Sequence, residues 1–215
     1  DYLARSSYML QQGKAVADVL WYYGEDNNVT GLYSHSFPDI PRGYNFDFAS
    51  PDVLLNELHV RNGKLCTKTG MSYSVLCLDP NTAKMSPEIR SKIEYFKSKG
   101  VKVCGHVGEE TSAVLAQMGV AQDWIYSGTD SLRFVHRTLP DAEIYWINSP
   151  ANEKRQAEVS LRVSGLKPYL WHPLTGVMKE VSYSFVQDRT QLLLDFEPND
   201  AYFIVFRGKT SQIVY

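Results

Sequence analysis

Residues 73–106 have the sequence YSVLCLDPNTAKMSPEIRSKIEYFKSKGVKVCGH, and this stretch predicts how the first half of the chain folds. Residues 73–78 are apolar enough for a buried strand, and the Asp-Pro-Asn that follows favours a turn. Ser86 is expected to cap a helix that ends at Gly100, and residues 101–105 form the next expected strand. A strand, a helix and a strand in roughly 35 residues make one βαβ unit, so the two strands should be parallel.

The flanking segments are expected to complete the sheet, because a buried parallel sheet needs helices on both of its faces. The pattern predicts a helix in residues 2–12, the first strand in residues 15–23 and another helix in residues 108–119. We therefore predict a doubly wound, mainly parallel α/β sheet of the flavodoxin-like type in residues 1–128.

The pattern changes near residues 124–131, beyond which no helix is predicted. Short segments such as 132–137, 143–147 and 201–206 are separated by turn residues, and residues 157–163 alternate apolar with polar. Short strands at regular spacing predict an antiparallel β-sandwich, here in residues 129–215.

The composition narrows the class of protein. The chain has 215 residues, of which 44% are hydrophobic and 21% charged, with a net charge of -2. These values are typical of a globular protein and give no basic surface for nucleic acid or an acidic membrane. No apolar run is long enough to span a bilayer. The chain begins with Asp1, without an initiator Met or a signal peptide, so we expect a mature form or a piece of a longer protein.

Three cysteines cannot all pair within the chain. Cys77 and Cys104 fall inside expected strands, so we predict that they lie on neighbouring strands, buried and reduced. Cys66 lies at the end of a β-hairpin that Asn62-Gly63 predicts through a type I′ turn, and it should be the most accessible thiol.

The sequence contains no clear nucleophile elbow, metal-ligand spacing or nucleotide-binding motif. Cys104-Gly105-His106-Val107-Gly108 lies where a nucleophile elbow would lie, but His106 and Val107 occupy the position between the glycines. A glycine turn beside a buried thiol is the simpler interpretation. The histidines are scattered, and neither a Gly-x-Gly-x-x-Gly motif nor a Walker lysine is present. We therefore predict no catalytic residue, no metal site and no cofactor.

Residues 26–50 are rich in aromatic side chains and follow the expected strand 15–23 at its carboxyl end, where α/β sheets hold ligands or partners. So much aromatic surface suits stacking on a sugar or burial against a partner domain, and we favour the partner. The candidate partner-facing or sugar-facing surface comprises Glu25, Asp26, Tyr33, His35, Phe37, Tyr44 and Phe46.

Several segments resemble glycoside hydrolase family 106, the α-L-rhamnosidase family. They include the opening residues 1–20 (DYLARSSYMLQQGKAVADVL), residues 39–48 (DIPRGYNFDF) and residues 71–76 (MSYSVL). In the second half they include residues 144–148 (IYWIN) and 165–171 (GLKPYLW). The order and spacing of these segments carry the resemblance, which extends to Arg207.

The resemblance implies that the chemistry lies elsewhere. In this family an upstream (β/α)₈ barrel carries the catalytic carboxylates and a calcium site, and no catalytic residue of the family falls on this chain. The α/β part is similar in fold to class I glutamine amidotransferases without their chemistry. The parent enzyme would be periplasmic or extracellular, in bacteria that degrade plant polysaccharides.

We therefore expect a non-catalytic accessory region that packs on the upstream catalytic barrel of the same parent protein. A stand-alone carbohydrate-binding or scaffold module is the alternative. An amidotransferase-like enzyme that uses Cys104 or His106 is a weaker third hypothesis.

Overall fold

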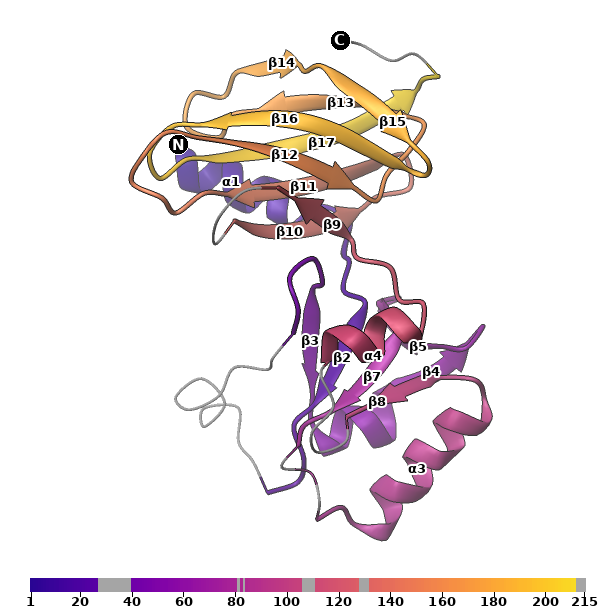
Figure 1. Ribbon diagram of the computed structural model, residues 1–215. Coiled ribbons are helices and arrows are strands. Elements are labelled where there is room, and N and C mark those ends of the chain that lie inside the picture. Colours follow the sequence, from indigo (N-terminus) through magenta and orange to yellow (C-terminus); the bar gives the residue numbers. More distant parts are fainter. Residues whose placement is uncertain (27–39, 81, 83, 106–110, 128–131, 212–215) are drawn as a thin grey trace. The chain divides into compact units, whose positions relative to one another are not determined.

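The computed structural model of the chain describes residues 1–26, 40–80, 82, 84–105, 111–127 and 132–211. The chain divides into two units (Figure 1). The β-sandwich unit consists of Asp1–Val16 and Asp123–Tyr215, and the parallel-sheet unit consists of Ala17–Gln122. This division differs from the expected one, 1–128 and 129–215, because Asp1–Val16 groups with the C-terminal half of the chain.

Two antiparallel sheets form the β-sandwich unit, which confirms the β-sandwich prediction. The six-stranded sheet has the order β1 (Lys14–Ala15), β10 (Arg133–Thr138), β11 (Ala142–Asn148), β17 (Ala201–Lys209), β13 (Leu166–Trp171) and β14 (Met178–Glu180). The four-stranded sheet has the order β15 (Tyr183–Val186), β16 (Arg189–Phe196), β12 (Arg155–Leu161) and β9 (Trp124–Tyr126). Alternate side chains point inward, and the core between the sheets includes Tyr145, Val159, Leu192 and Ile204.

The N-terminal helix α1 (Tyr2–Leu10) packs on the outer face of the six-stranded sheet, where Met9 joins Ile144 and Phe203 in a hydrophobic cluster. The chain then turns at Gly13 and pairs β1 with β10. Gly13 has φ +56°, and a Cβ atom there would lie 2.2 Å from the carbonyl oxygen of Thr138. Glycine is therefore required at this close approach. The prediction that residues 2–12 cover a parallel α/β sheet is wrong, because an apolar helix face does not specify which sheet it covers.

The parallel-sheet unit contains the predicted βαβ unit. Its four-stranded sheet has the order β3 (Phe46–Ala49), β2 (Val19–Tyr22), β7 (Val75–Leu78) and β8 (Lys102–Cys104), and all of these pairs are parallel. Helix α3 (Pro87–Ser98) connects β7 to β8. The Ser86 hydroxyl accepts a hydrogen bond from the Ile89 amide at 3.3 Å, so the predicted N-cap is confirmed.

Each face of this sheet packs against a helix. Ile93 of α3 lies with Leu20 of β2 in one hydrophobic cluster. Leu115 of α4 (Thr111–Gln117) lies with Val19 of β2 in another. Because successive residues of a strand point to opposite faces, these two clusters cover the two sides of the sheet.

The remaining elements differ from a doubly wound domain. Between β3 and β7 lie a π-helical turn, η1 (Val53–Glu57), and an antiparallel sheet of β4 (Leu58–Arg61), β5 (Lys64–Thr67) and β6 (Ser72–Tyr73). Asn62 and Gly63 both have positive φ, 51° and 72°, as a type I′ turn requires, so the hairpin prediction is confirmed.

The prediction of a doubly wound, flavodoxin-like sheet is wrong, and the amidotransferase-like fold is not supported. In the described residues the parallel pairing is confined to one small four-stranded sheet, and the other sheets are antiparallel. The sequence pattern identified the βαβ unit correctly but overestimated the extent of the parallel sheet. The prediction had counted helix α1 as a cover of the parallel sheet, whereas this helix belongs to the β-sandwich unit.

A disulfide joins β7 to β8. Cys77 and Cys104 are direct partners in the parallel register, with Cα atoms 4.8 Å apart, and they form the disulfide. The prediction that they lie buried on neighbouring strands is confirmed, but the prediction that they are reduced is wrong. Two buried cysteines in an unknown register could equally have been free thiols. Cys66 is a free, partly exposed thiol.

We expect reduction of this disulfide to destabilise the parallel-sheet unit. The bond closes a loop with a sequence separation of 27, for which chain entropy predicts a stabilisation of about 3–4 kcal/mol. Amide hydrogen exchange at Leu20 and Leu76, with and without dithiothreitol, measures the effect. The Cys66→Ser variant is the control and should respond to the reductant as the wild type does. Unchanged protection of both amides after complete reduction would contradict the expectation.

Candidate functional site

The surface predicted around Glu25 to Phe46 is only partly described. Tyr33, His35 and Phe37 lie outside the described residues. Glu25 and Asp26 are exposed just after β2, and the Glu25 carboxylate accepts a hydrogen bond from the Ser86 amide at 2.6 Å. Glu25 therefore lies at the N-terminus of α3, where a negative charge is favourable.

Tyr44 and Phe46 contribute to the unit's own packing. Both are partly buried against the hydrophobic cluster on the α4 side of the sheet. The Tyr44 hydroxyl donates to the Val120 carbonyl oxygen at 2.7 Å, and the Phe46 and Phe48 rings meet edge to face at 5.4 Å. The structure thus separates these two rings from the exposed carboxylates with which they were grouped.

The Cys104-Gly105 turn offers no free thiol. Cys104 is half of the disulfide, so it offers no thiolate. His106 lies outside the described residues. Gly105 has φ +110°, and a Cβ atom there would lie 2.2 Å from the Leu78 carbonyl oxygen, so this glycine permits close approach of the backbone.

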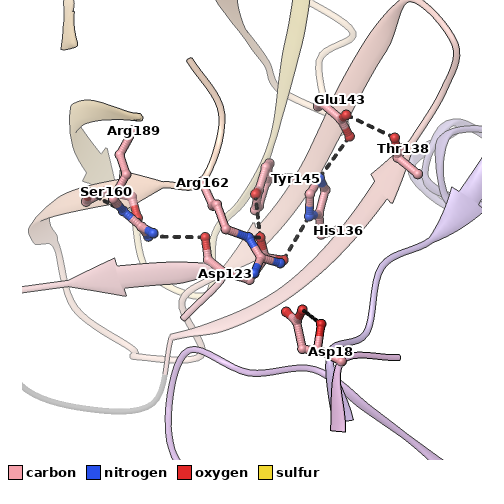
Figure 2. A network of polar contacts seen from close by, with 10 residues as sticks. Asp18, Asp123, His136, Thr138, Glu143, Tyr145, Ser160, Arg162 and Arg189 are labelled. Atoms are coloured by element: carbon pink, nitrogen blue, oxygen red, sulfur yellow. Dashed lines mark hydrogen bonds and ion pairs between the residues drawn. The ribbon is translucent and has the colours of Figure 1, made fainter. Parts of the chain in front are cut away.

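A buried polar network in the β-sandwich unit was not predicted (Figure 2). Asp123 Oδ2 lies 2.8 Å from His136 Nδ1, and Glu143 Oε2 lies 3.0 Å from His136 Nε2. Thr138 donates from its hydroxyl to the other Glu143 oxygen at 2.9 Å. The side chains of His136 and Asp123 are 6% and 1% exposed, whereas that of Glu143 is 26% exposed, so the contacts run from the core toward the surface.

Further groups hold Asp123 in place. The Tyr145 hydroxyl donates to Asp123 Oδ1 at 2.8 Å, and its ring stacks on that of His136 with centroids 3.9 Å apart. Arg162 Nε lies 3.4 Å from Asp123 Oδ1. The Arg189 guanidinium donates to the Asp123 carbonyl oxygen at 3.2 Å. The buried carboxylate is therefore both neutralised and hydrogen-bonded, as its burial requires.

The strand register creates this arrangement. β10 and β11 pair so that His136 lies opposite Tyr145 and Thr138 lies opposite Glu143. Glu143 and Tyr145 alternate along β11 with the core residue Ile147, and their cross-strand partners share their face, so all four residues belong to the inner face of the six-stranded sheet. Asp123 immediately precedes β9 of the other sheet. The polar residues at inward positions of the expected hairpin could have indicated a buried polar network. Asp123 lies outside the hairpin, and nothing in the sequence around it indicates that it takes part.

The surroundings raise the pKa of His136. Burial alone would lower it, but the hydrogen bonds to Asp123 and Glu143, with the charges of both carboxylates, outweigh burial. Burial and the adjacent Asp123 also raise the pKa of Tyr145 far above its usual value, so its hydroxyl stays protonated and donates. Both ring nitrogens of a protonated His136 can then donate, one to each carboxylate.

This geometry suits a structural role better than catalysis. A general base needs an unprotonated ring nitrogen within reach of a substrate, and here each nitrogen of His136 faces a carboxylate. In the described part of the chain, no three His, Cys, Asp or Glu side chains cluster so that they could hold a metal ion. The network joins β9, β10 and β11 and thereby the two sheets of the unit.

Comparison with known proteins finds relatives that are named as glycoside hydrolases. The model of glycoside hydrolase family 106, described as α-L-rhamnosidase, matches residues 1–111 and 106–185. A protein of Formosa agariphila named "Putative beta-glucuronidase" is 30% identical over 99% of this chain. The chain spans only 21% of that relative's length.

The similar solved structures are also glycoside hydrolases by name. A rhamnosidase from Novosphingobium sp. PP1Y matches all of this chain with a TM-score of 0.93 and 26% identity, and the chain spans 24% of its length. An α-L-fucosidase from Paenibacillus thiaminolyticus matches 97% of the chain with a TM-score of 0.62 at 11% identity, over 51% of its own length. The second likeness shows the fold alone.

The His136 network makes the stability of the β-sandwich unit depend on pH. The folded-state pKa of His136 lies above the 6.5 of an ordinary histidine. The stabilisation from its protonation is therefore fully present below about pH 6.5 and is lost as the pH rises through the folded pKa. We expect His136→Gln to lower the free energy of unfolding by up to about 3–5 kcal/mol at pH 6, because the buried Asp123 carboxylate keeps Arg162 but loses its imidazolium partner.

Hydrogen exchange at the amides of Tyr145 and Ile204 at pH 6 and pH 9 measures this loss. The difference between the variant and the wild type should shrink at pH 9. His59→Gln, which replaces an exposed histidine of the other unit, is the control and should have no effect on these amides. An equal loss at both pH values would show that the charge of His136 contributes nothing.

Proposed function

The chain belongs to glycoside hydrolase family 106, the α-L-rhamnosidase family, and from that premise we propose that it is a non-catalytic accessory region of an α-L-rhamnosidase-like glycoside hydrolase. It spans about a quarter of the solved rhamnosidase that it resembles, so most of such an enzyme lies outside this region. The family resemblance implies that the catalytic barrel lies upstream. Plant polysaccharides are the proposed substrate class of the parent enzyme.

The engagement of the buried carboxylates is the observation that carries this proposal. Hydrolysis of a glycoside needs two carboxyl groups on either side of one sugar bond, about 5–9.5 Å apart and open to substrate. Asp123 is enclosed by its partners, Asp18 accepts a hydrogen bond from the Ser74 hydroxyl at 3.2 Å, and Asp79 accepts one from the Trp21 indole at 3.1 Å. These carboxylates serve the packing of their own units.

An oxidising compartment suits the chain. We propose that the parent enzyme is periplasmic or extracellular, because a buried structural disulfide such as Cys77–Cys104 forms and persists where the environment is oxidising. None of the described helices is long and apolar enough to cross a membrane.

An exposed apolar surface on the β-sandwich unit is a proposed contact with the catalytic barrel. Arg5 of α1 donates to the Leu174 carbonyl oxygen at 2.9 Å, which ties the helix to the turn between β13 and β14. Exposed apolar side chains lie at and just after this turn, namely Leu174, Val177 and Met178, which are 65%, 58% and 64% exposed. Clustered apolar side chains of this kind favour burial against another domain.

Carbohydrate binding is the second candidate function. It is favoured by a hollow beside Tyr126 that is lined by an aromatic ring and by polar side chains. This hollow is compatible with the accessory role and also with a stand-alone binding module.

We expect the isolated chain to hydrolyse no rhamnoside. Incubation with an aryl α-L-rhamnoside should release no more aryl alcohol than the urea-unfolded chain does, because the described buried carboxylates are engaged by partners within their own units. A rhamnosidase that contains its barrel is the positive control. Release that requires the folded chain and is lost in Asp123→Asn or Glu25→Gln would contradict the proposed function.

The apolar surface can be tested in the longer parent enzyme. Leu174→Asp combined with Met178→Asp should leave the melting temperature of the isolated chain unchanged, because both side chains are already in water. In the parent enzyme each buried apolar side chain contributes about 1.5–3 kcal/mol, so the same changes should lower its melting temperature measurably by calorimetry. Lys179→Asp, an exposed residue of the same strand, is the charge-matched control. An unchanged parent enzyme would exclude this surface as the contact.

A further inference from the structure

We propose that the β-sandwich unit binds one neutral sugar ring in the hollow beside Tyr126. The hollow has a volume of about 210 Å³, and six of its lining residues are relevant here. They are Tyr126, Glu153, Arg155, Gln156, Ala157 and Phe196. The proposal takes only the class of ligand from the proposed function, and it assigns the accessory region a binding site of its own.

The Tyr126 ring packs against a row of other aromatic rings. Phe134 and Trp124 have ring centroids 4.9 Å apart, and Trp124 and Tyr126 follow at 4.6 Å. Trp124 is buried to 1% exposure, whereas Tyr126, at the outer end of this row, is only partly buried. The ring is therefore held from behind by a rigid core. A preorganised aromatic face loses little conformational entropy when the apolar face of a sugar stacks on it.

The polar side chains of the hollow can both donate to and accept from sugar hydroxyls. Arg155 donates to Glu153 at 2.8 Å, and both side chains retain exposure, 27% and 69%. The Gln156 side-chain amide donates to Asp195 at 2.7 Å, which fixes its orientation. A hydroxyl group is at once a donor and an acceptor, so neighbouring hydroxyls of one sugar can contact the guanidinium and the carboxylate together.

The charges favour a neutral sugar over an acidic one. Glu153 and Arg155 cancel each other within the hollow. At its border Lys154 pairs with Glu197 at 2.8 Å, which adds no net charge. A uronic acid or a phosphorylated sugar would need an excess of positive charge, and none of these pairs supplies it.

The other hollows of this unit suit a sugar less well. The 490 Å³ hollow beside the β10–β11 turn is lined by no aromatic ring among the described residues, and its Asp141 and Arg207 already pair at 2.8 Å. The 310 Å³ groove on the four-stranded sheet touches Tyr183, but that side chain belongs to the core. Drug-sized ligands occupy about 300–1,000 Å³, so the 210 Å³ hollow at Tyr126 fits a single sugar ring.

The test is a titration of the intact 215-residue chain with methyl α-L-rhamnopyranoside, followed by NMR chemical shifts. We expect saturable shifts at Tyr126 and Gln156. Tyr126→Ala should weaken binding at least tenfold, whereas Tyr126→Phe, which keeps the ring, should bind within about threefold of the wild type. Tyr8→Ala removes an exposed tyrosine from α1 and should bind as the wild type does.

Three results would overturn the proposal: no shift with the rhamnoside, equal binding by Tyr126→Ala in a variant that keeps the wild-type spectrum elsewhere, or tighter binding of D-glucuronate than of the neutral sugar. Each of these would leave the accessory role intact, because that role is judged by hydrolysis and not by binding. Conversely, hydrolysis by the chain would overturn the accessory role whether or not Tyr126 binds a sugar.

Discussion

The β-sandwich unit depends on one imidazole held between two carboxylates. An Asp123 carboxylate that is 1% exposed would cost several kcal/mol if it were ionised and unpaired. His136 compensates this cost, with hydrogen bonds at both nitrogens, and Tyr145 and Arg162 complete the shell of Asp123. Because Asp123 precedes a strand of one sheet and His136 lies in the other, the same contacts fix the position of the two sheets.

Both units place potentially reactive groups in structural roles. In the β-sandwich unit His136 contacts both Asp123 and Glu143, and two of the three cysteines of the chain are joined across adjacent strands of the other unit. Catalytic groups, in contrast, are aimed at a substrate and tuned by groups behind them. On the proposed function, a hydrolase of this family contains a region in which His, Asp and Glu are in contact, and its chemistry takes place in another part of the enzyme.

Local sequence signals predicted local structure well. Ser86-Pro87 gave the start of α3, Asn62-Gly63 gave the hairpin turn, and alternation gave the β-sandwich, since each depends on a few neighbouring residues. Contacts between segments that are distant in the sequence could not be predicted from such local signals. The partner of α1, the register that brings Cys77 opposite Cys104, and the approach of Asp123 to His136 are each decided by packing between distant segments.

The protonation state of the His136 ring decides whether a cation lies between the two carboxylates. Nitrogen-15 NMR of the imidazole across pH 5–9 reports both ring nitrogens of His136 separately. We expect both nitrogens to carry protons at pH 6 and the ring to lose one of them only above the ordinary histidine pKa of 6.5. A ring that is already neutral at pH 6, with one unprotonated nitrogen, would contradict this expectation, because such a nitrogen could act as a base.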